Sequence, residues 1–129
     1  MSSQASTVAV VDDDARVLES LEDLLESAGH IVLVFGSGKA LLDDQAFAAI
    51  DCLITDIGMP QLDGFELQRL AQARRPGLPV ILISGRHEIA DQQRAAALGN
   101  HGLFFKPFDG QALLAAVRRA VTAAINKGD

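Results

Sequence analysis

Five short, largely apolar runs alternate along the chain with segments in which apolar residues recur at helical spacing, and this alternation restricts the fold more than any other feature. The runs are three to five residues long, and they lie at 7–11, 31–35, 52–55, 80–83 and 103–105. Continuous apolar runs of this kind suit strands that are buried on both faces of a sheet. Strands and helices that alternate through short connections predict a doubly wound α/β fold with helices on both faces of a parallel sheet.

The strand order follows from the connections. Right-handed crossovers leave few arrangements, and the order 2-1-3-4-5 of a flavodoxin-like (βα)5 fold places the first and third strands side by side. Asp14 and Asp109 are the expected N-caps of the first and last helices, and Gly29 is the expected end of the first. A second helix is expected from Ser37 to about Phe47.

The other helices differ in their apolar stripes. The third is expected to start near Phe65 and to end at Arg74-Arg75, a pair that we interpret as solvated, and the last carries apolar residues up to Ile125. The fourth, at about 88–98, is mostly alanine with Ile89. We therefore expect this fourth helix to dock loosely on the sheet.

Charge and cysteine content restrict the class of protein. The 129 residues carry a net charge of −6 and a single cysteine, and we expect one compact domain, 1–129, with its core at about 7–125. The acidic balance argues against nucleic-acid binding by this segment, because phosphate contacts need clustered Lys and Arg. Cys52 lies in an apolar run and is expected to be buried and reduced, which favours the cytoplasm. No apolar stretch is long enough to span a membrane.

Polar side chains follow four of the five expected strands, at the edge where ligands bind in open α/β sheets. Three carboxylates follow the first strand, one carboxylate the third, a hydroxyl the fourth and an amine the fifth: Asp12, Asp13, Asp14, Asp56, Ser84 and Lys106. Adjacent carboxylates repel one another unless a hard divalent cation such as Mg²⁺ lies between them. A metal, an ammonium and a hydroxyl together stabilise a phosphoryl group, which a carboxylate can accept.

Each of these residues also has an ordinary structural interpretation. The acids after the first strand can cap a helix, Ser84 can end a strand, and Lys106 can extend along the surface. We prefer a shared site because all the positions fall at one edge of the expected sheet. By contrast, 36–39 (Gly-Ser-Gly-Lys) only mimics a phosphate-binding loop, since it lacks the first glycine and the final hydroxyl of that motif.

As a set, the motifs resemble the receiver domains of two-component response regulators, over nearly the whole chain from about Thr7 to Ile125. The residues that carry the resemblance are an acidic pair, a phosphoacceptor loop, a hydroxyl switch and a lysine motif: Asp12-Asp13, Thr55-Asp56-Ile57-Gly58-Met59-Pro60, Ile83-Ser84-Gly85 and Phe105-Lys106-Pro107-Phe108.

The resemblance implies a role for each residue of the site. Asp56 is the implied acceptor of a phosphoryl group from a sensor histidine kinase or a phosphotransfer protein, with Ser84 and Lys106 beside it. The implied ligands of Mg²⁺ are Asp13, Asp56, the backbone carbonyl of Gly58 and, through water, Asp12. The peptide bond before Pro107 is implied to be cis.

The resemblance also implies a signalling domain rather than an enzyme, apart from self-catalysed phosphotransfer and autodephosphorylation. The face of the fourth helix, fifth strand and fifth helix is implied to switch, and to bind a second copy or an output domain. Family members commonly carry Tyr or Phe three residues before the lysine, where this chain has Leu103, and Phe104 points to the opposite face of the sheet. We therefore expect the signal to travel through the 84–88 loop.

Two alternatives remain at this point. A phosphohydrolase of the haloacid dehalogenase type would use Asp12 as nucleophile and Asp14 as acid/base, but the chain has no acidic pair after Lys106, no cap domain and no role for Asp56. A receiver-like module that is never phosphorylated is disfavoured, because no required site residue is missing. Steady turnover of a phosphomonoester would favour the phosphohydrolase.

Overall fold

The computed structural model describes residues 5–86 and 88–128, and beyond residue 123 only the course of the helix. Five parallel strands form one sheet in the order β2-β1-β3-β4-β5, which confirms the predicted topology. The strands are β1 Thr7–Val11, β2 Ile31–Phe35, β3 Cys52–Asp56, β4 Val80–Ser84 and β5 Leu103–Phe105. The three inner strands are almost completely buried, as their continuous apolar runs predict.

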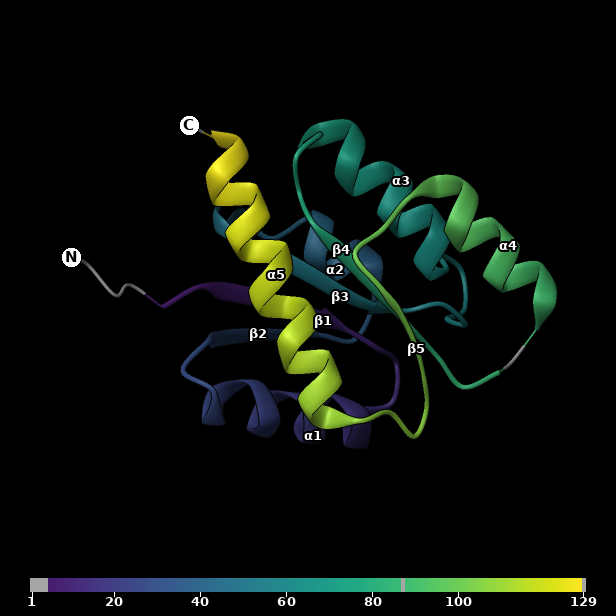
Figure 1. Ribbon diagram of the computed structural model, residues 1–129. Coiled ribbons are helices and arrows are strands. Elements are labelled where there is room, and N and C mark those ends of the chain that lie inside the picture. Colours follow the sequence, from purple (N-terminus) through teal and green to yellow (C-terminus); the bar gives the residue numbers. More distant parts are fainter. Residues whose placement is uncertain (1–4, 87, 129) are drawn as a thin grey trace.

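Helices cover both faces of this sheet (Figure 1). They are α1 Ala15–Ser27, α2 Gly38–Leu42, the 3₁₀ helix η1 Gln45–Ala49, α3 Gly64–Arg74, α4 Ile89–Leu98 and α5 Gly110–Gly128. One apolar core lies between the sheet and α1 with α5, and a second lies between the sheet and α2, η1 and α3. Val10 faces the first core and Val11 the second, because successive side chains of a strand point to opposite faces. No helix among the described residues combines the length and apolarity needed to cross a bilayer.

The ends of α1 and the start of α5 follow the predicted signals. Asp14 Oδ1 accepts a hydrogen bond from a backbone N–H of α1 at 2.9 Å, and Asp109 Oδ1 does the same for α5 at 2.9 Å. Gly29 follows α1 with φ +94°, a conformation that glycine adopts without strain. Ile125, predicted on the apolar stripe of the last helix, lies beyond the side chains that the structure describes.

The continuous helix predicted from Ser37 to about Phe47 is wrong. Ser37 does cap a helix, with its Oγ accepting a backbone hydrogen bond at 3.1 Å, but α2 ends after Leu42. Asp44 then accepts a backbone hydrogen bond at 2.8 Å and starts η1. A short acidic side chain competes for backbone donors in this way, so a new cap forms where periodicity predicts an unbroken helix.

The expectation that Arg74 and Arg75 are merely solvated is also wrong. Their guanidinium groups donate hydrogen bonds to the carbonyls of Leu42 and Phe47 at 2.9 and 2.7 Å. Both groups lie over the Phe47 ring, 4.5 and 5.8 Å from its centroid. The arginines therefore bind carbonyls that the ends of α2 and η1 leave without a helical partner.

The helix α4 buries little of its surface. Asp91 and Ala95 are its buried residues, whereas Ile89 is 70% exposed and Leu98 is 43% exposed. This agrees with the loose docking expected from its thin apolar stripe.

Candidate functional site

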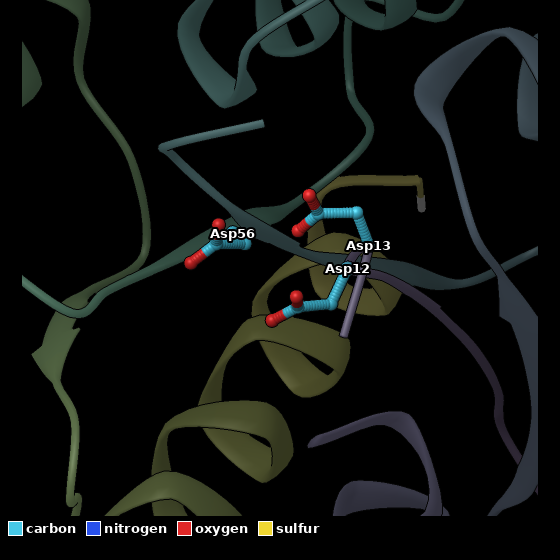
Figure 2. Close-up of side chains that lie close together, drawn as sticks. All are labelled: Asp12, Asp13 and Asp56. Carbon is cyan, nitrogen blue, oxygen red and sulfur yellow. The ribbon is translucent and has the colours of Figure 1, made fainter. Parts of the chain in front are cut away.

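The carboxyl ends of β1 and β3 bring three carboxylates together. The two strands are neighbours, with Val11 opposite Thr55, so the residues that follow them meet at one edge of the sheet. Asp12, Asp13 and Asp56 each offer an oxygen, and these oxygens lie within 4.8 Å of one another (Figure 2). Asp12 and Asp56 are 1% and 5% exposed, whereas Asp13 is exposed to solvent. Such clustered oxygens repel one another and match the donors of a hard divalent cation.

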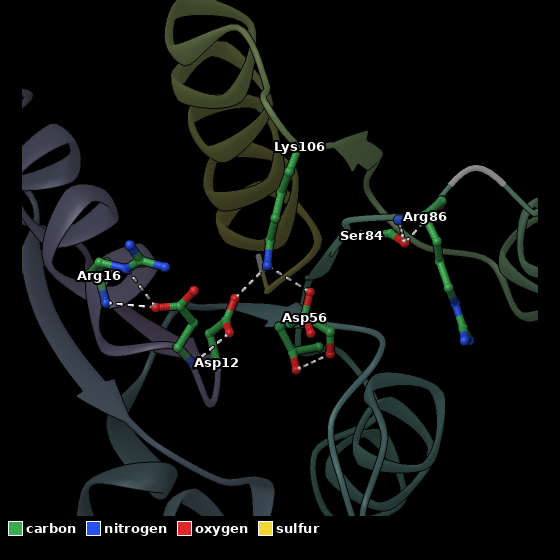
Figure 3. A network of polar contacts seen from close by, with 8 residues as sticks. Asp12, Arg16, Asp56, Ser84, Arg86 and Lys106 are labelled. Atoms are coloured by element: carbon green, nitrogen blue, oxygen red, sulfur yellow. Dashed lines mark hydrogen bonds and ion pairs between the residues drawn. The ribbon is translucent and has the colours of Figure 1, made fainter.

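Lys106 reaches this cluster from the end of β5 (Figure 3). Its Nζ donates a hydrogen bond to Asp12 Oδ2 at 3.0 Å and lies 3.1 Å from Asp56 Oδ1. Burial by itself lowers the pKa of Lys106, but the hydrogen bonds to the two carboxylates outweigh it and raise the pKa above its ordinary value. Burial raises the pKa of Asp12, against its hydrogen bonds from Asp14 N–H and Lys106. The ammonium therefore stays charged and offsets part of the acid repulsion.

Ser84 ends β4 with its hydroxyl bonded within its own loop. Its Oγ donates to the Arg86 carbonyl at 2.9 Å and accepts from the Arg86 N–H at 3.1 Å (Figure 3). The guanidinium of Arg86 in turn pairs with Asp91 of α4 at 2.8 Å. Neither Arg86 nor Asp91 is predicted from the sequence, where their only signal is opposite charge on either side of an expected helix start.

The loop that follows Asp56 is drawn tightly against α3. The N–H of Gly64, the first residue of α3, donates to the Ile57 carbonyl at 2.9 Å. A Cβ on Gly64 would lie 2.4 Å from the Asp56 carbonyl oxygen, so a larger residue would push this loop away from the sheet.

All the predicted site residues surround one open depression, to which Gly85 and Arg86 also contribute: Asp12, Asp13, Asp56, Gly58, Ser84 and Lys106. The peptide bond between Lys106 and Pro107 is cis, as the resemblance implies. Asp14 also borders the depression, but its carboxylate caps α1, and the hydrogen bond from Arg16 N–H lowers its pKa. The Asp14 carboxylate is thus engaged in capping α1, whereas the phosphohydrolase alternative would need it as acid/base.

The fold and the site define an α/β protein in which carboxylates, a lysine and a hydroxyl share the topological switch point of the sheet. The chain belongs to the response regulator receiver domain family, whose sequence model matches residues 8–118. It is therefore a signalling domain of two-component systems, and the phosphohydrolase alternative has no support among its relatives. Receiver domains in general bind Mg²⁺ at an acidic pocket and interact with histidine kinases.

Individual proteins resemble the chain over almost its whole length. The response regulator protein TodT of Pseudomonas putida strain F1 is 38% identical over 124 residues, which cover 96% of this chain and 55% of TodT. The structure of the response regulator StyR matches with a TM-score of 0.86 and 35% identity, covering 96% of this chain and 63% of StyR. The BeF3-activated receiver domain of DrrB matches with a TM-score of 0.84 and 28% identity, covering 92% of this chain and 99% of that domain. The chain thus spans about half the length of TodT.

Proposed function

We propose that Asp56 receives a phosphoryl group from a phosphohistidine on a sensor histidine kinase or a phosphotransfer protein, in a Mg²⁺-dependent reaction. One observation carries the proposal: carboxylates from two neighbouring strands converge within 4.8 Å, and a single ammonium bridges two of them. This leaves a surplus of negative charge and a carboxylate nucleophile at the mouth of a buried strand. A surplus of this kind is costly unless the site binds a cation.

The residues fit Mg²⁺, because carboxylate and carbonyl oxygens are the ligands that this ion takes in proteins. The proposed ligands are Asp13, Asp56, the backbone carbonyl of Gly58 and, through water, Asp12. When bound there, the ion supplies the positive charge that lets a phosphoryl dianion approach an acidic site.

Phosphoryl transfer needs a nucleophile, here a carboxylate, and a leaving group, here the imidazole nitrogen of the donor histidine. A carboxylate oxygen of Asp56 attacks phosphorus, a P–O bond forms, and the P–N bond to the donor imidazole breaks. The imidazole keeps the electron pair and takes up a proton. Lys106, which lies 3.1 Å from Asp56, is near enough to bind an oxygen of the transferred group, and Ser84 can bind another once it leaves Arg86.

The proposal extends to the domain's surroundings. We assign the core to about 7–125, place the protein in the cytoplasm and expect loss of the phosphoryl group by self-catalysed hydrolysis. The α4–β5–α5 face, on which Ile89 and Leu98 are exposed, is the proposed surface for a second copy or an output domain. The net charge of −6 supports the absence of direct nucleic-acid binding by this segment.

The test is labelling of Asp56. Wild-type protein is incubated with Mg²⁺ and acetyl phosphate for intact-mass analysis, or with Mg²⁺ and beryllofluoride for fluorine NMR. We expect one equivalent on the wild type, none on Asp56→Asn, and full labelling of Asp23→Asn, an exposed aspartate on α1 that serves as the matched control. Equal labelling of Asp56→Asn would disprove the assignment of the acceptor.

A further inference from the structure

We propose that Arg86 and Asp91 form a latch that holds the Ser84 hydroxyl in its resting orientation and ties it to the first turn of α4. The inference rests on the proposed function, since it concerns the state in which Ser84 binds a phosphoryl oxygen on Asp56. It assigns Arg86 and Asp91 the role of positioning the Ser84 hydroxyl, and it connects that hydroxyl to α4 through hydrogen bonds.

The Ser84 hydroxyl has no spare proton in the resting state. A serine hydroxyl has one O–H donor, and here that donor serves the Arg86 carbonyl at 2.9 Å. The Arg86 N–H adds a second bond to the same oxygen at 3.1 Å. Ser84 can therefore donate to a phosphoryl oxygen only after it releases the Arg86 carbonyl, so the position of the Arg86 backbone decides whether the switch can occur.

The Arg86 side chain anchors that backbone to α4. Its Nε lies 2.8 Å from Asp91 Oδ2, and a second guanidinium nitrogen lies 3.4 Å from Oδ1. The Asp91 side chain is 11% exposed, and a buried carboxylate is costly without a partner. The hydrogen bond that Arg86 donates to Asp91 also raises the pKa of Arg86. In Figure 3 the guanidinium lies apart from Asp56 and Lys106, and its ion-pair partners are Asp91 and Glu88 near the start of α4.

Among the residues that the structure describes, few other contacts hold the start of α4. Its N-cap residue Glu88 makes no side-chain capping bond, and Ile89 is 70% exposed. The ion pair with Asp91 is therefore one of the few contacts at the first turn of this helix, together with the 3.8 Å approach of Arg86 Nε to Glu88 Oε1. When Ser84 turns toward a phosphoryl oxygen, the freed Arg86 backbone can move, the pair with Asp91 opens, and the first turn of α4 loses this contact.

The latch stabilises the resting state, so breaking it favours the switched state. A ligand that binds the switched state more tightly then gains affinity, because it no longer has to break the latch. Beryllofluoride with Mg²⁺ is such a ligand for this site. Whether loss of the Arg86 charge raises or lowers the affinity for beryllofluoride therefore distinguishes a latch from an ordinary charge effect.

The experiment compares beryllofluoride affinity, in the presence of Mg²⁺, for wild type, Arg86→Gln and Asp91→Asn. The latch predicts that both variants bind more tightly, by about fivefold or more, the lower range of measured couplings. If Arg86 instead acts through its charge or as a direct ligand, Arg86→Gln binds more weakly and Asp91→Asn more tightly. Changes in beryllofluoride affinity of opposite sign in the two variants, or no change in either variant, would overturn the latch.

A double-mutant cycle supplies the second test. In a Ser84→Ala background the hydroxyl is gone, so adding Arg86→Gln should leave the affinity unchanged. A gain that persists without the hydroxyl would overturn the latch. Arg86 is an exposed side chain, so Arg86→Gln is expected to fold even if Asp91→Asn does not, which thermal melts check. If the wild type binds no beryllofluoride, the proposed function is overturned. If the wild type binds it and both variants bind with the same affinity as the wild type, only the latch is overturned.

Discussion

The two sides of the site are built differently. The carboxylates stand at the ends of β1 and β3, strands whose residues are almost all buried between two apolar cores. On the other side, β5 is three residues long with no residue fully buried, and the neighbouring α4 buries only Asp91 and Ala95. Close-packed strands hold charged groups in place, whereas thinly packed elements move at low cost. The site thus has a rigid half, the carboxylates at the ends of β1 and β3, and a more mobile half formed by β5 and α4.

The contacts of α4 with α3 sharpen this contrast. The buried residues of α3 include Phe65 and Leu67, which pack in the core. By contrast, α4 contributes only its buried Ala95 to that core. Two polar contacts add to it, with Arg94 4.6 Å from the Phe65 ring centroid and Gln68 Nε2 donating to the Gly99 carbonyl at 2.6 Å. Each such contact contributes about 1 kcal/mol, far less than a buried core. A new bond at Ser84 is of the same size and can shift α4.

The largest expected effect is on the metal. Asp13→Ala should abolish Mg²⁺ binding, because it removes a proposed direct ligand from the rigid half. Asp12→Ala should weaken binding by about 10- to 100-fold, as for a group that acts through water. Titration of Mg²⁺ by calorimetry measures both, and equal affinity of Asp13→Ala and wild type would remove Asp13 from the metal site.

The next effect is on stability and compares the halves directly. Ile54 in β3 is fully buried and Ile89 in α4 is 70% exposed. Ile54→Ala should lower the free energy of unfolding by about 2–5 kcal/mol, through lost burial and a cavity, and Ile89→Ala by at most about 0.5 kcal/mol. Urea denaturation measures both, and similar losses would contradict the contrast between the halves.

Lys106 tests whether the halves act separately. Lys106→Ala should leave Mg²⁺ affinity unchanged or improve it, because the variant removes a positive charge next to Asp12 and Asp56. The same variant should slow phosphorylation of Asp56 or blunt the response to it. Phosphorylation and response at wild-type levels would reduce Lys106 to a structural role.

The smallest effect concerns Leu103, which packs with the second core while its neighbour Phe104 packs with the first. Adding beryllofluoride and Mg²⁺ should give the largest backbone NMR shifts outside the site between Ser84 and Leu98. Leu103→Val should leave those shifts nearly intact, because Leu103 only follows the loop. Their disappearance, with Asp56 still labelled, would make Leu103 itself the switch.

The sequence by itself determined the sheet order and the residues gathered at its edge. Apolar runs that end in Asp12, Asp56, Ser84 and Lys106 are visible without coordinates, and parallel strands must bring their carboxyl ends to one edge. Capping at Asp14 is likewise local, since it depends on residues within one turn.

Only the tertiary structure decided the contacts between segments that are far apart in the sequence or that the helical and strand periodicities do not relate. The close approach of Gly64 to Asp56, the arginines over Phe47 and the break after Leu42 depend on how separate segments or competing caps meet in space. The same holds for the link from Ser84 through Arg86 to Asp91. The spacing of residues in the sequence indicates which face of its helix or strand a side chain lies on. It does not indicate which polar group that side chain contacts, because the distance between two segments is set by how the core packs.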